Sequence, residues 1–123
     1  MNYLLIGIAG AVGAIARYAV GGYVSTNTNT AFPLETLIIN VSGSLVLGFV
    51  ATAGFERFVA NPDLRTALTI GFLGAYTTFS TLSLETLRLI ENGSYGLALL
   101  NAFGSLTLGF LAAWIGVVLA RAI

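Results

Sequence analysis

Four long apolar stretches alternate with short polar connections along this chain. The stretches run over residues 3–24, 33–55, 64–90 and 95–119. A helix needs about 20 mostly apolar residues to cross a bilayer, and each stretch is long enough. Regular alternation of apolar and polar residues does not persist, which disfavours strands. The pattern therefore predicts an all-α membrane protein, with residues 1–123 forming one four-span domain.

The connections carry the polar and turn-forming residues. The first, STNTNTA, comes just before Pro33, a residue suited to a first helical turn. The second, ERFVANPD, is charged and contains Asn-Pro, and the third, ENGS, contains a turn glycine. None is long enough to hold a second domain. The first span lacks the basic start of a signal peptide and contains Arg17, so we expect it to be retained.

Composition narrows the function to membrane chemistry. The chain is 57% hydrophobic and only 8% charged, whereas soluble domains carry about 25% charged residues. It has no Cys, His or Lys, which removes thiolate nucleophiles, imidazole bases and Schiff-base lysines. Five arginines balance five acids, so no basic surface for nucleic acid is expected. We expect a non-enzymatic protein whose surroundings are the lipid bilayer.

The arginines are spread almost evenly between the two ends of the predicted bundle. An even number of spans puts both termini on one side, together with Arg57, Arg65 and Arg121. Arg88 lies on the other side, and Arg17 lies toward that end of its span. Cytoplasmic loops normally hold a clear excess of positive charge. The weak bias here predicts that the chain inserts in both orientations.

Two polar windows repeat one another. NVSGSLVLGF, which begins at Asn40, matches NAFGSLTLGF, which begins at Asn101, at seven of ten positions. A spacing of four places Asn40 beside Ser44 on one helical face, and Asn101 beside Ser105 on another. Such side chains either hydrogen-bond neighbouring helices or line a path for a solute. Because all of them donate hydrogen bonds and none is charged, a path of this kind suits a small anion.

The third stretch combines glycines with a run of hydroxyls. Gly71 and Gly74 precede TTFSTLS, which begins at Thr77. Glycine and consecutive threonines weaken a helix, so a break near residues 74–78 is expected. Carbonyls exposed at such a break can bind a hard cation such as Na⁺. The alternative is an unbroken helix whose hydroxyls bond back to their own carbonyls.

Two ionisable residues fall within the apolar stretches. Arg17 lies in the first and Glu85 in the third. Charges at membrane depth are costly and therefore indicate function. The alternative is that each side chain reaches the membrane interface.

Motifs in all four stretches resemble those of the Fluc (CrcB) fluoride channels of bacteria. GAVGAIARY, from Gly10, is similar to G-x-x-G-A-x-x-R-[WY], and ETLIINVSG, from Glu35, is similar to G-T-L-x-V-N-x-x-G. GFLGAYTTFSTLSLE, from Gly71, is similar to G-x-x-G-G-x-T-T-F-S-T-F-S-x-E. The fourth stretch has the Gly-Ser pair at Gly104. These matches cover nearly the whole chain.

The resemblance implies a fold and an activity. Members of this family are four-span, dual-topology homodimers with a broken third helix, and two antiparallel subunits enclose two narrow pores. They passively export fluoride across the bacterial inner membrane. A structural Na⁺ at the dimer centre is held by backbone carbonyls, which by motif would be those of Gly74 and Thr77. Arg17 matches the family's first-span arginine.

The resemblance also assigns pore residues. Asn40, Phe79 and Ser105 match the pore asparagine, the first pore phenylalanine and the fourth-span serine, and Asn101 stands where a second hydroxyl is often found. Leu82 occupies the place of a second pore phenylalanine. The full expected set that faces fluoride is Thr36, Asn40, Ser44, Phe79, Leu82, Asn101 and Ser105.

Departures from the motifs leave a second interpretation open. Besides Leu82, Glu35 and Ala75 replace motif glycines. The chain is then either a homodimeric channel or one half of a heterodimer with a degenerate pore. A small proton-coupled multidrug exporter is a weaker alternative, because such proteins need a carboxylate in the first span and residues 3–24 contain none. A structural subunit without transport is the remaining class.

Overall fold

The computed structural model describes residues 2–56 and 61–123, and these residues form helices and no strand. The long helices α1 and α2 are followed by two composite rods. In chain order the elements are α1 (Tyr3–Asn27), α2 (Leu34–Glu56), α3 (Pro62–Thr66), η1 (Ala67–Leu73), α4 (Gly74–Tyr76), α5 (Phe79–Glu91), α6 (Tyr95–Leu99), η2 (Leu100–Gly104) and α7 (Ser105–Ala122). The segments η1 and η2 are π-helical.

Four rods are long and apolar enough to cross a membrane, in agreement with the predicted number. They are Tyr3–Asn27, Leu34–Ala53, Pro62–Glu91 and Tyr95–Ala122. The first is longer at its C-terminal end than the apolar stretch that predicts it. Its last turn is extended by Thr26 and Asn27, whose side chains donate to the carbonyls of Gly22 and Tyr23 at 2.7 and 2.8 Å.

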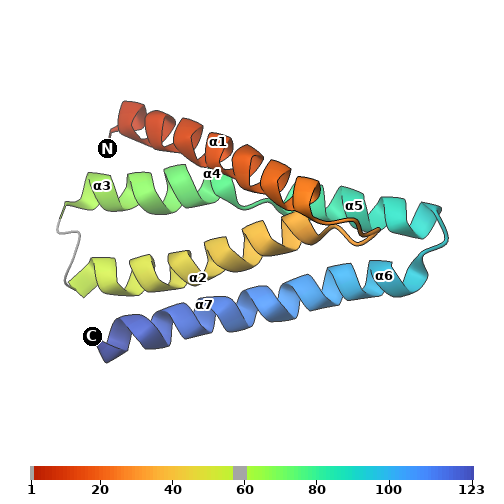
Figure 1. The fold of residues 1–123 in the computed structure, drawn as a ribbon. Helices are drawn as coiled ribbons and strands as arrows, with labels where there is room; N and C mark the ends of the chain where they lie inside the picture. Colours follow the sequence, from red (N-terminus) through yellow and green to blue (C-terminus); the bar gives the residue numbers. More distant parts are fainter. Residues whose placement is uncertain (1, 57–60) are drawn as a thin grey trace.

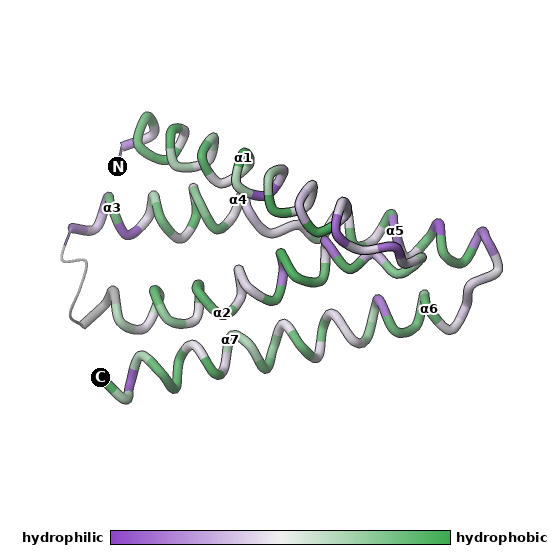
Figure 2. The backbone as a smooth tube through the Cα atoms, viewed as in Figure 1, coloured by the Kyte–Doolittle hydropathy of each residue, from purple (hydrophilic) through white to green (hydrophobic). Residues whose placement is uncertain are grey.

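The rods lie side by side, with both termini at one end of the molecule (Figure 1). The α1–α2 and α5–α6 connections lie together at the opposite end. The second of these turns at Gly93, whose φ of 78° suits a residue without a side chain. Figure 2 shows apolar residues along most of each rod, with hydrophilic residues near the ends and at a few internal positions. Large hydrophobic side chains such as those of Tyr18, Ile70 and Leu106 are exposed, so the outer surface suits lipid.

Glycines allow the closest helix contacts. A Cβ atom added at Gly48 on α2 would collide with the backbone carbonyl of Ala113 on α7. One added at Gly13 on α1 would collide with the backbone of Phe72 in η1. Because helix association in lipid depends on close packing, these glycines set the separations of α2 from α7 and of α1 from η1.

Candidate functional site

The backbone leaves helical geometry in the middle of the third rod. Helix α4 ends at Tyr76 and α5 begins at Phe79. Thr77 has φ −81° and ψ 158°, and Thr78 has φ −149° and ψ 118°, so both residues are extended. We call residues 77–78 the interruption. It lies within the region where the sequence predicts a weak helix.

Two carbonyls next to the interruption lose the amides that a continuous helix would give them. In an α-helix the amide of Thr78 would donate to the carbonyl of Gly74, and that of Thr81 to the carbonyl of Thr77. Here the Thr78 amide donates to Asn40 Oδ1 at 2.8 Å, and the Thr81 amide donates to Thr78 Oγ1 at 3.2 Å. Side chains therefore take both amides away from Gly74 and Thr77.

Asn40 on α2 holds the interruption with both ends of its amide. Its Oδ1 accepts from the Thr78 amide, and its Nδ2 donates to the Thr78 carbonyl at 3.0 Å. An unpartnered backbone group in a dry interior costs about 1–3 kcal/mol, so one side chain removes two such costs. A Cβ atom added at Gly43, one turn along α2, would collide with the Thr77 side chain. Helix α2 can therefore approach the interruption closely enough for Asn40 to reach it.

A groove of about 660 Å³ runs between α2, α5 and α7 beside the interruption. Five of the predicted fluoride-facing residues line it: Asn40, Ser44, Phe79, Leu82 and Ser105. Phe79 is 81% exposed, so its ring stands out from the rest of the chain. The remaining lining residues are Leu47, Thr77, Thr78, Ser83, Thr86, Ala102, Leu106, Gly109 and Phe110. No charged side chain lies among these lining residues.

Some groove residues were not singled out from the sequence. Phe110 ends the second copy of the repeated window and places another aromatic ring at the groove. Its position in the repeat was a usable signal. Thr86 and Ser83 also line the groove, and both belong to the face of α5 that carries Phe79 and Leu82. Ser83 is four residues after Phe79 and Thr86 is four residues after Leu82, so helical spacing from the two predicted residues would have found them.

Asn101 does not line the groove, although the sequence placed it among the fluoride-facing residues. Its side chain is 0% exposed. Its Nδ2 donates to Thr86 Oγ1 at 3.0 Å, and its Oδ1 accepts from Ser105 Oγ at 3.4 Å. Asn101 therefore lies behind the wall of the groove and contacts two residues that form the wall.

Thr36 lies apart from the groove as well. It is 3% exposed, and its hydroxyl donates to Glu85 Oε1 at 2.6 Å. Both residues line a second cavity of about 610 Å³ between α1, α2 and α5, together with Arg17. Thr78 lines this cavity and also the groove. The charged residues predicted inside the spans thus gather on one side of the interruption, and the neutral groove lies on the other.

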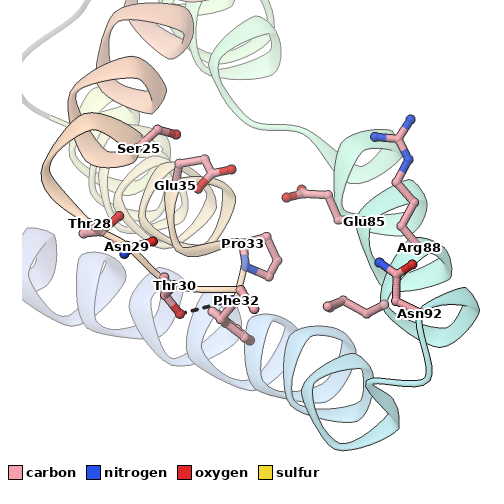
Figure 3. Close-up of a pocket in the computed structure, with 12 residues that line it drawn as sticks. Ser25, Thr28, Asn29, Thr30, Phe32, Pro33, Glu35, Glu85, Arg88 and Asn92 are labelled. Carbon is pink, nitrogen blue, oxygen red and sulfur yellow. Dashed lines mark hydrogen bonds between the residues drawn. The ribbon is translucent and has the colours of Figure 1, made fainter.

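A third hollow lies at the end of the bundle where the α1–α2 connection meets α5 (Figure 3). Its volume is about 370 Å³. The carboxylates of Glu35 and Glu85 point toward one another across it, whereas Arg88 points away (Figure 3). Glu35 and Glu85 line the second cavity too. Over residues 2–56 and 61–123, no group of three or more His, Cys, Asp or Glu side chains is placed to hold a metal ion.

Comparisons with known proteins agree on one family. The family described as CrcB-like protein, Camphor Resistance (CrcB), matches residues 4–117. A fluoride-specific ion channel FluC from Solibacter usitatus is 42% identical over 98% of this chain and 99% of its own length. Fluoride-specific ion channel FluC 1 from Moorella thermoacetica is 45% identical over 98% of this chain and 86% of its own. The FluC protein of Acidobacterium capsulatum is 43% identical over 100% of this chain and 98% of its own. The chain therefore belongs to the CrcB family.

Proposed function

We propose that this protein is a fluoride-selective ion channel that lets cytoplasmic fluoride leave the cell passively across the bacterial plasma membrane. The observation that carries the proposal is the groove, in which uncharged hydrogen-bond donors and an exposed phenylalanine ring lie together. The names of the relatives, fluoride-specific ion channels, support the same conclusion.

The groove supplies what a dehydrated fluoride ion needs. An asparagine amide has two N–H donors, and Asn40 uses one of them on the Thr78 carbonyl, which leaves the other for an anion. The hydroxyls of Ser44 and Ser105 add donors along the groove. The edge of an aromatic ring carries partial positive charge, so Phe79 can also face fluoride. Because these contacts are neutral, each holds the ion weakly and permits its release.

The carbonyls of Gly74 and Thr77 are the proposed ligands of a structural Na⁺. They fit this role because the amides that would normally satisfy them donate to Asn40 and Thr78 instead. Na⁺, a hard cation, prefers oxygen ligands of this kind. Such an ion would supply positive charge close to the groove, which favours an anion there. An experimental density map with no ion touching both carbonyls would contradict the assignment.

A second copy of the chain in the opposite orientation would complete the pore. The groove is open along one side of the protomer, and Phe79 extends from it with 81% of its surface exposed. The arginine distribution gives little preference for either orientation. Both observations support an antiparallel dual-topology homodimer in which the partner covers the groove.

The first prediction concerns selectivity. Purified protein in liposomes loaded with both halides is expected to release fluoride down its gradient, whereas chloride stays largely inside. Chloride is larger and more weakly hydrated, so it gains less from closely spaced donors in a narrow path. Ion-selective electrodes for each halide record the release. Equal fluoride and chloride release would show that the proposed function is wrong.

The second prediction compares groove variants. Phe79→Ile is expected to lower fluoride release because it removes the ring edge. Asn40→Asp is expected to lower it by more than about tenfold. A unit charge about 4 Å away costs an anion about 4 kcal/mol at an effective dielectric constant of 20, and Asp also loses the donor to the Thr78 carbonyl. The same electrode assay, at matched protein content, gives the comparison.

Leu82→Phe serves as the opposing variant in that series, and should preserve or raise release. Leu82 lines the groove. If Leu82 marks a degenerate pore that needs a second, homologous chain, wild type alone should not release fluoride. Release that is absent from wild type and present in Leu82→Phe would favour that alternative over the homodimeric channel.

The third prediction concerns orientation. Asn29 and Asn61 lie in connections at opposite ends of the bundle (Figure 1), and the native chain has no cysteine. Single cysteines at these positions are each expected to react with an impermeant thiol reagent from both sides of the membrane, to a similar extent. Reaction of each position from one side alone would contradict antiparallel assembly.

A further inference from the structure

Most hydroxyl groups along the third rod donate hydrogen bonds to backbone carbonyls of the same rod. Thr69 and Thr77 donate to the carbonyls four residues earlier at 2.9 and 3.0 Å. Ser83 and Thr86 do the same at 3.0 and 2.8 Å. This is the usual behaviour of a hydroxyl inside a helix. A hydroxyl bonded in this way must give up a good hydrogen bond before it can donate to an ion.

Ser105 is held differently. Its hydroxyl donates to the side chain of Asn101, one turn earlier, at 3.4 Å, which is beyond the usual range of 2.5–3.0 Å for such bonds. The side chain lines the groove although only 6% of its surface is exposed. The Ser105 hydroxyl therefore faces the proposed ion path and donates only a weak hydrogen bond, to Asn101.

The orientation of Asn101 is fixed by Thr86. The Thr86 hydroxyl donates its hydrogen bond to the Leu82 carbonyl. Toward Asn101 its oxygen can therefore only accept. The amide nitrogen of Asn101 must then face Thr86, at 3.0 Å, and the amide oxygen must face Ser105. With 0% of its surface exposed, Asn101 has no room for another arrangement and does not reach the groove.

We propose that Asn101 is a positioning residue, which keeps the hydroxyl of Ser105 off the helix backbone and ready to donate to fluoride. This inference rests on the proposed function and assigns a role within it. When fluoride arrives, the Ser105 hydroxyl rotates and donates its hydrogen bond to the ion instead of to Asn101 Oδ1, so only a long hydrogen bond is lost. When fluoride leaves, the hydroxyl donates to Oδ1 again. Asn101 itself never contacts the ion.

The inference predicts a dependence between two substitutions. In Asn101→Ala the Ser105 hydroxyl is free to donate to the carbonyl of residue 101, as Thr86 does to that of Leu82. Fluoride release should then fall about three- to tenfold, the range expected for one hydrogen bond. Fluoride release by Ser105→Ala should fall by a similar factor. The double variant should match Ser105→Ala, because Asn101 acts only through Ser105.

The experiment measures fluoride release from liposomes that contain wild type, the two single variants or the double variant. Thr107→Val is the matched control, since it removes a hydroxyl from the same helix at an exposed position outside the groove lining. It should release fluoride like wild type. Elution of the detergent-solubilised protein as a single species verifies that each variant folds, and Asn101→Leu, which keeps the branched shape of the side chain, repeats the test.

The outcomes separate this inference from the proposed function. No release from wild type would show the proposed function wrong. Release from wild type, with Asn101→Ala and Asn101→Leu unaffected, would overturn the inference alone. It would also be overturned if the two single effects multiplied in the double variant, because Asn101 would then act independently of Ser105. Failure of both Asn101 variants to fold would make Asn101 a structural residue and would likewise contradict the proposal.

Discussion

The two hydrogen bonds between Asn40 and Thr78 are the interaction on which the rest of the site depends. They let the third rod leave helical geometry inside the protein without leaving the Thr78 amide and carbonyl unpaired. Non-helical backbone at membrane depth requires such internal partners. The same interruption redirects the amides of Thr78 and Thr81, so the carbonyls of Gly74 and Thr77 lose their helical donors. Asn40 thus stabilises the interruption beside the groove and, together with the Thr78 hydroxyl, frees the two carbonyls of the proposed cation site.

Uncharged side chains lie on one side of the interruption, and charged side chains lie on the other. On one side, the groove offers amide, hydroxyl and aromatic groups. On the other, Arg17 and the hydrogen-bonded pair of Thr36 and Glu85 line the second cavity. A negative carboxylate inside the groove would repel an anion. Glu85 lies on the far side and is bonded to Thr36, so the chain holds an acid within its third span while the lining of the groove stays uncharged.

The sequence predicts the four spans well, because apolar length is a direct consequence of bilayer thickness. It predicts much less about which polar residues face the groove. Asn40 and Asn101 begin nearly identical windows, yet one lines the groove and the other is buried behind it. The difference comes from the partner, since Asn40 meets extended backbone at Thr78 and Asn101 meets the hydroxyl of Thr86. The π-helical segment around Asn101 has no signal in the spacing of apolar residues.

Amide hydrogen exchange of the segment 74–81, compared between wild type and Asn40→Leu, tests the central claim most directly. Leu has the same branched shape but cannot accept a hydrogen bond from the Thr78 amide or donate one to its carbonyl. Exchange at Thr78 should become much faster in the variant, whereas exchange in the part of α7 around Ala113 and Gly116, which packs on Leu45 and Gly48 of α2, should stay the same. Unchanged protection of Thr78 would mean that Asn40 does not hold the interruption, and the account would be wrong at its foundation.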